Sequence, residues 1–112
     1  MKVKIKDTRE IGKLIFKGCW ADVKWTKDGK PTEEQKTDES GTPLWRVKAL
    51  LGDEVIRVSV PVVKSPGERL NDGDEIVFCG FVIESHENKG RPGRWEKLTA
   101  EKIVVAKKKG TE

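Results

Sequence analysis

Hydrophobic and polar side chains alternate along much of this chain, and the alternation predicts β-strands. Val3 and Ile5 alternate with lysines at the amino terminus, which is the period-two pattern of a half-buried strand. Residues 44–51 and 56–62 alternate in the same way on either side of Gly52-Asp53-Glu54, so we expect a β-hairpin there. Residues 8–17 have room for a short helix, but no 3.6-residue apolar period persists over three turns.

Three further segments complete the expected strands. Residues 14–25 predict a strand that bends at Gly18, and residues 76–83 predict a strand covered on both faces with a bulge or bend at Gly80. Residues 95–105 form the last strand.

Two stretches predict loops. Residues 26–43 are nearly free of apolar side chains and carry Gly and Pro turn signals, which indicates a long loop or a protruding hairpin. Residues 85–94 are rich in Asn, Gly and Pro, which indicates a flexible loop.

Five principal strands after the opening one favour an all-β fold, namely a small five-stranded antiparallel barrel of the OB type with long loops. An SH3-like barrel fits nearly as well, whereas a seven-stranded sandwich needs more strands. We expect one domain over residues 1–106 and a basic, disordered tail over residues 107–112. The expected core contains Val47, Ala49, Ile56, Val58, Val60, Val77 and Cys79, and Trp20 is expected to pack there as well.

The net charge and the lack of long apolar segments limit the kinds of partner that the protein could bind. The net charge is +4, from 23 basic and 19 acidic residues, which is compatible with a polyanionic partner. No stretch resembles a signal peptide or approaches the ~20 apolar residues of a membrane span, so we expect a cytoplasmic protein with no membrane partner.

Candidate chemistry is sparse. Cys19 and Cys79 are expected to be buried, reduced thiols, and His86 is the only histidine, so a zinc site would lack ligands. No spacing indicates a nucleophile with its base or a phosphate-binding loop. We therefore expect no catalytic residue, no metal and no cofactor.

Tryptophans and cations are interleaved along the chain, and this is the main functional signal. Single-stranded nucleic acid is held by cations that bind phosphates and by rings on which bases stack. The candidate binding residues are Trp25, Trp45, Arg46, Lys48, Arg57, Lys89, Arg91, Arg94, Trp95 and Lys97.

Each group of candidates has a second interpretation. Trp45 shares its parity with apolar neighbours and can instead be a core residue. The cations of the 44–62 hairpin form either a phosphate track or an ordinary solvated face. The loop over residues 89–94 either approaches a phosphate through its glycines or is a mobile hairpin tip.

The order of these elements resembles a known family. Val3-Lys4-Ile5-Lys6, the hairpin over 45–62 and the ending Val104-Val105-Ala106-Lys107 are similar to the gene V type of single-stranded-DNA-binding proteins of filamentous phages. Thr37-Asp38-Glu39-Ser40-Gly41-Thr42-Pro43-Leu44 resembles a stretch in small regulatory proteins of actinobacterial conjugative elements. The resemblance implies an OB fold, a dimer and strand binding through basic and aromatic side chains, with no enzymatic activity. The chain departs from that pattern because it has no tyrosine and its 26–43 loop is acidic.

The leading hypothesis is a non-catalytic single-stranded DNA-binding protein of a phage or plasmid that acts in replication or transfer, with RNA as the other possible ligand. We expect a homodimer formed at an open barrel edge, with Phe78 and Val82 facing outward. The alternative is a protein-interaction or regulatory module whose contact is the acidic segment 33–39, and a structural phage component is a weaker third.

Overall fold

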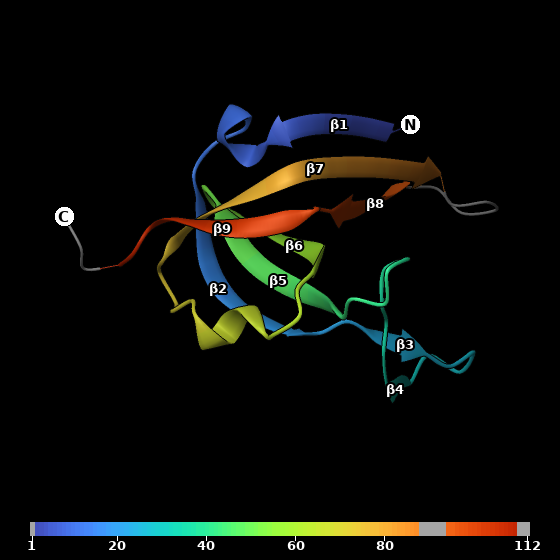
Figure 1. Cartoon of the computed structure of the whole chain (residues 1–112). Helices are drawn as coiled ribbons and strands as arrows, with labels where there is room; N and C mark the ends of the chain where they lie inside the picture. Colours follow the sequence, from blue (N-terminus) through green and yellow to red (C-terminus); the bar gives the residue numbers. More distant parts are fainter. Residues whose placement is uncertain (1, 88–93, 110–112) are drawn as a thin grey trace.

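Strands account for most of the chain, and they are arranged around one core (Figure 1). The computed structural model describes residues 2–87 and 94–109, with the backbone alone described for residues 86, 87 and 94–96. The strands are β1 (Lys2–Asp7), β2 (Leu14–Ala21), β3 (Val23–Trp25), β4 (Pro31–Gln35), β5 (Leu44–Leu51), β6 (Glu54–Pro61), β7 (Glu75–Glu87), β8 (Arg94–Thr99) and β9 (Lys102–Lys107). Two 3₁₀ turns, η1 (Thr8–Glu10) and η2 (Pro66–Glu68), connect them.

The all-β prediction is confirmed, since the described residues contain no α-helix. The short helix considered for residues 8–17 is reduced to η1. No helix in the described part of the chain is long and apolar enough to cross a membrane.

Five strands form a ring of hydrogen-bonded pairs in the order β7, β2, β5, β6, β8 and back to β7. The β6–β8 pair is parallel and is registered at Ser59 and Thr99, whereas the other pairs of the ring are antiparallel. The expectation of a purely antiparallel arrangement is therefore wrong at this pair, and the sheet is mixed. The break at Ala100 and Glu101 also divides the expected last strand into β8 and β9.

The core lies inside this ring and uses the apolar face of the predicted hairpin. Val47, Ala49, Val58 and Val60 are completely buried, and burying each valine contributes about 1.5–3 kcal/mol. Val77 is also buried, and Ile56 packs against the core cluster from a half-buried position. These predictions are confirmed, but Cys79 is half-buried and lies outside the cluster.

The buried face of β7 changes sides at Gly80, which has φ +62°. Ile76 and Phe78 are buried before this glycine and Phe81 is buried after it, so the predicted bend is confirmed. A side chain at Gly80 would meet Glu101 at 2.6 Å. The prediction that Phe78 faces outward is wrong, because Phe78 is 0% exposed and its ring centroid lies 6.3 Å from that of Phe81. Val82, the other residue of the expected outward pair, is half-buried. The expected dimer therefore loses the support of Phe78, while β1 and β9, which each pair only with β7 among the described strands, keep a free edge.

A register shift between Phe16 and Gly18 reverses which side chains of β2 face the core, as expected for the predicted bend at Gly18. Phe16 is buried before the shift, and after it Cys19 is the Cα partner of the core residue Val47. Trp20 therefore faces outward and is 43% exposed, so its expected place in the core is wrong. Cys19 is free and half-buried, as is Cys79, so neither thiol is as buried as expected.

The expected protruding hairpin is formed by β3 and β4, which pair apart from the ring as a two-stranded sheet. It begins earlier than predicted because Asp22 ends β2, and Trp25 belongs to the hairpin. Both ends of the expected 85–94 loop belong to strands, since β7 continues to Glu87 and β8 begins at Arg94. The rest of that predicted loop, residues 88–93, lies outside the described part of the chain.

The carboxylate of Asp74 fixes the carboxyl-terminal end of the described chain. It accepts hydrogen bonds from the backbone nitrogens of Lys109 and Asn71, each at 2.8 Å, and from Lys108 Nζ at 3.0 Å. These donors, the backbone N–H of Lys109 foremost, lower the pKa of Asp74 from 3.8 to about 2. The expected tail thus begins inside β9, and residues 110–112 lie outside the described part.

Candidate nucleic-acid interface

The outer faces of β2, β5, β6 and β8 form one continuous surface. Side chains alternate across a strand, so the neighbours of the buried valines point away from the core. Trp20, Arg46, Ser59 and Thr99 are successive Cα partners across these four strands and form one outward row.

A second row lies beside the first. Gly18, Lys48 and Arg57 are successive Cα partners on β2, β5 and β6. On β8, Lys97 lies two residues before Thr99, the residue registered with Ser59 of β6, and Arg57 lies two residues before Ser59, so Lys97 extends this row toward β7. We call Trp20, Arg46, Lys48, Arg57 and Lys97 the cationic face.

The cations of this face form no ion pair in the described part of the chain, although Lys97 lies directly opposite Glu84 of β7. None of Arg46, Lys48, Arg57 and Lys97 forms an ion pair with a described carboxylate, whereas Lys13, Lys17 and Lys24 each do so elsewhere. Lys48 and Arg57 lie directly opposite each other, and like charges in that position destabilise a sheet. The arrangement costs stability and favours the approach of an anion.

The predicted tryptophans lie in different places. Trp25 is on β3 and is 61% exposed. Trp45 is half-buried on the core side of β5, and its indole Nε1 donates a hydrogen bond to the Val62 carbonyl at 3.0 Å. Trp20, which sequence analysis placed in the core, is the indole that lies directly opposite Arg46.

The remaining candidates fall in or beside the gap in the described chain. Lys89 and Arg91 lie outside the described residues, and only the backbone of Arg94 and Trp95 is described, as the first two residues of β8. The structure therefore brings together Arg46, Lys48, Arg57 and Lys97 of the predicted set, and leaves Trp25 on a separate hairpin.

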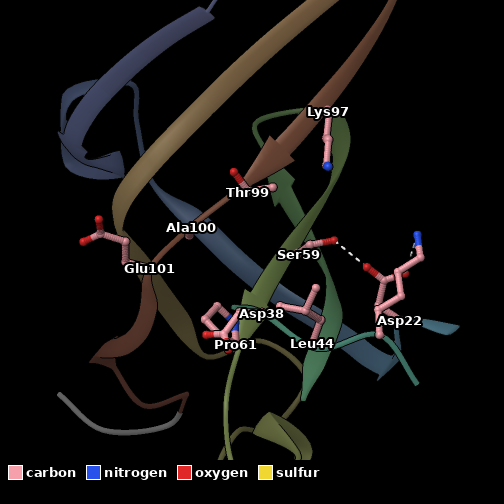
Figure 2. Close-up of a pocket in the computed structure, with 10 residues that line it drawn as sticks. Asp22, Asp38, Leu44, Ser59, Pro61, Lys97, Thr99, Ala100 and Glu101 are labelled. Carbon is pink, nitrogen blue, oxygen red and sulfur yellow. Dashed lines mark hydrogen bonds and ion pairs between the residues drawn. The ribbon is translucent and has the colours of Figure 1, made fainter. Parts of the chain in front are cut away.

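A cleft of about 330 Å³ opens at one end of the cationic face, between β6, β8 and the segment that joins β4 to β5 (Figure 2). Leu44, Pro61 and Ala100 provide apolar walls. The polar lining residues are Asp22, Lys36, Asp38, Ser59, Lys97, Thr99 and Glu101. Lys97 belongs to both the cationic face and the cleft, so the two are continuous.

Asp22 and Ser59 are joined inside this cleft. Ser59 Oγ donates a hydrogen bond to Asp22 Oδ2 at 2.9 Å, and Lys36 Nζ lies 3.9 Å from Asp22 Oδ1. Asp22 is only 5% exposed, and Figure 2 shows its carboxylate pointing directly toward Ser59. Sequence analysis missed this pair because 37 residues separate its members, and only the sheet brings them together.

The acidic segment is partly neutralised within its own hairpin. Lys24 Nζ lies 2.8 Å from Glu34 Oε1. Asp38 Oδ1 accepts the backbone N–H groups of Ser40 and Thr42, each at 2.9 Å, which is the ordinary use of an Asp in a turn. These contacts give Glu34 and Asp38 local structural roles.

Among the side chains that the structure describes, those of residues 2–85 and 97–109, no three His, Cys, Asp or Glu residues are grouped so that they could hold a metal ion. Comparison with models of protein families, with curated protein sequences and with solved structures finds no match to this chain.

Proposed function

We propose that this chain is an OB-type protein that binds single-stranded nucleic acid on its cationic face and carries out no reaction on it. In the OB fold, a five-stranded Greek-key barrel, the face of the second and third strands and the loops after the first and fourth strands bind oligonucleotides. In this ring those strands are β5 and β6, and the first of those loops is residues 22–43, whereas residues 88–93, between β7 and β8, lie outside the described part of the chain. The order of the ring and its parallel closing pair support this assignment.

The observation that carries the proposal is the pair Lys48 and Arg57, which lie directly opposite each other and form no ion pair with a described carboxylate. Lys97 adds a third cation on the neighbouring strand β8. Phosphates about one nucleotide apart would relieve the repulsion among these cations and release condensed counterions. No ion pair in the described part of the chain offsets the repulsion between Lys48 and Arg57.

Trp20 adds the second component of strand binding. Its exposed indole lies across from Arg46, at the edge of the same face. Base stacking on such a ring contributes about 1–3 kcal/mol per base. A duplex hides its bases from a ring placed in this way, so the combination favours single strands.

The test is a titration of the protein with a strand of about thirty thymidines, followed by tryptophan fluorescence and by anisotropy of a labelled strand. We expect saturable binding with quenching, and an affinity that falls steeply as salt rises, with a slope of about −0.7 per phosphate contact. Absence of saturable binding at low salt would exclude the proposal, because low salt is where a cationic face binds best.

The second candidate function is a protein-interaction module, and the exposed hairpin favours it. Trp25 is the most exposed of the described tryptophans and lies on the same small sheet as Glu33 and Glu34. Exposed indoles are enriched at protein interfaces. A strand that fails to bind at any salt concentration, together with a protein partner that is lost on Trp25→Ala substitution, would support this alternative.

A further inference from the structure

The cleft beside the cationic face differs from that face in its charge. Three of its lining residues are carboxylates (Asp22, Asp38 and Glu101) and two are lysines (Lys36 and Lys97). Glu101 also lies 3.8 Å from Nζ of Lys4, which is outside the lining. The cleft therefore has no excess of positive charge to hold a phosphate, and a neutral base needs none. Its volume of about 330 Å³ lies at the lower end of the ~300–1,000 Å³ range of small-molecule pockets, which suits a single base.

The floor of the cleft offers hydrogen-bond acceptors. The one hydroxyl hydrogen of Ser59 is donated to Asp22 Oδ2, so Ser59 presents only lone pairs to a ligand. Asp22 Oδ1 receives no hydrogen bond from any described residue, since Lys36 Nζ stands 3.9 Å away. No fully buried side-chain oxygen in the described part lacks a partner, so Oδ1 keeps some access to solvent, and Asp22 is one of the residues that line the cleft.

We propose that this cleft receives one base of the bound strand and prefers guanine, through the carboxylate of Asp22. Guanine carries N1–H and N2–H₂ donors side by side, which match a carboxylate oxygen beside a hydroxyl lone pair. Cytosine and adenine offer one amino group each, and thymine presents carbonyl oxygens on both sides of its single N–H donor. The ring lies between Leu44, Pro61 and Ala100.

Lys97 connects this base site to the strand outside it. In Figure 2 its amino group points from β8 toward Ser59 and Asp22, at the rim of the cleft. It also ends the row that begins with Lys48 and Arg57. The phosphate of the inserted nucleotide would therefore bind Lys97, while its base reaches Asp22. The inference rests on the proposed function, because the strand must lie along this face.

The experiment compares four thymidine strands of about nine nucleotides in which the central base is dG, dC, dA or dT. All four carry the same phosphates, so differences among them report on the base rather than on charge. A single dG per strand also prevents folding of the strand on itself. We expect the dG strand to bind about tenfold more tightly than the all-dT strand, with dC and dA between them.

Asp22→Asn tests the assignment to this carboxylate. It keeps the shape of the side chain but replaces one acceptor oxygen with a donor, so the preference for dG should fall to about twofold or less. Asp53→Asn is the matched control, because it makes the same charge change in the exposed β5–β6 turn. Asp53→Asn should retain the full preference.

The outcomes separate the two proposals. If none of the strands binds at low salt, the proposed function fails. If all four wild-type affinities agree within about twofold, strand binding stands and the base site is wrong. The wild-type series alone decides this, so the inference stays testable even if Asp22→Asn is poorly folded. If Asp22→Asn and Asp53→Asn keep the same preference, Asp22 is not the residue that selects the base.

Discussion

The two faces of the β5–β6 hairpin are built from the same strands and are used in opposite ways. On the inner face, Val47, Ala49, Val58 and Val60 are completely buried and close the ring. On the outer face, Lys48 and Arg57 stand opposite each other without a described acidic partner. The inner face stabilises the fold, whereas the like charges on the outer face lower its stability. Under the proposed function, the phosphates of a bound strand would relieve that repulsion. Neighbouring residues on one strand should therefore have separable effects on stability and on binding.

The largest difference in the free energy of unfolding is expected between the variants Val58→Asp and Arg57→Asp. Val58→Asp places an unpaired carboxylate in the core, at a cost of several kcal/mol, which is comparable with the whole stability of a small domain at about 5–15 kcal/mol. We expect that variant to lack a cooperative unfolding transition. Arg57→Asp should change the unfolding free energy by less than about 1 kcal/mol and should weaken strand binding. Urea unfolding and anisotropy titrations measure both, and similar stabilities for the two variants would contradict the assignment of faces.

The next largest effect is expected on strand affinity, when the cations Lys48, Arg57 and Lys97 are removed together. Lys48→Ala, Arg57→Ala and Lys97→Ala together should weaken binding at low salt by about tenfold or more and reduce the salt slope by about 2, at ~0.7 for each phosphate contact. The matched control removes Lys2, Lys6 and Lys64, which are exposed elsewhere. If both triple variants lose affinity equally, net charge rather than the row drives binding.

A smaller effect separates the two exposed tryptophans. Trp20→Ala should weaken binding by about fivefold or more, the lower end expected for one lost base stack. Trp25→Ala, on the separate hairpin, should weaken binding less and should keep most of the fluorescence quenching. If Trp25→Ala weakens binding more than Trp20→Ala does, the strand crosses the β3–β4 hairpin and not the row of outward residues that contains Trp20.

The sequence was sufficient to predict the strands whose alternation is unbroken, such as β5 and β6, and hence the buried valines and the cations opposite them. The sequence-based prediction was wrong for Trp20 and Phe78. Trp20 follows the register shift of β2, and Phe78 precedes Gly80, and at each of these points the buried side chains move to the other face of the strand. Alternation predicts a face only until such a point, and the position of a register shift depends on the neighbouring strand. The parallel β6–β8 pair and the Asp22–Ser59 hydrogen bond depend in turn on how the ring closes. Local patterns do not contain that information.

The smallest expected effect on strand affinity is at Asp74, which lies away from both faces of the hairpin. This residue tests whether the stability of the fold can change while strand binding does not. The pKa of Asp74 is lowered from 3.8 to about 2, so its ionised form stabilises the folded state. That contribution is complete above the unfolded value of 3.8 and is lost as the pH falls toward 2. Asp74→Asn cannot titrate, so it should be less stable than the wild type at pH 7, and the difference should shrink between pH 4 and pH 2.

Urea midpoints measured across that pH range give the comparison, with Asp53→Asn as a control for the loss of an exposed charge. Strand affinity at pH 7 should stay within about twofold of the wild type, because Asp74 bonds Asn71, Lys108 and Lys109 and touches no residue of the cationic face. Parallel midpoint curves for Asp74→Asn and wild type would show that this carboxylate does not stabilise the fold through its charge. A loss of affinity equal to that of the row variant would show that the two faces are coupled, and the comparison on which these predictions rest would have to be abandoned.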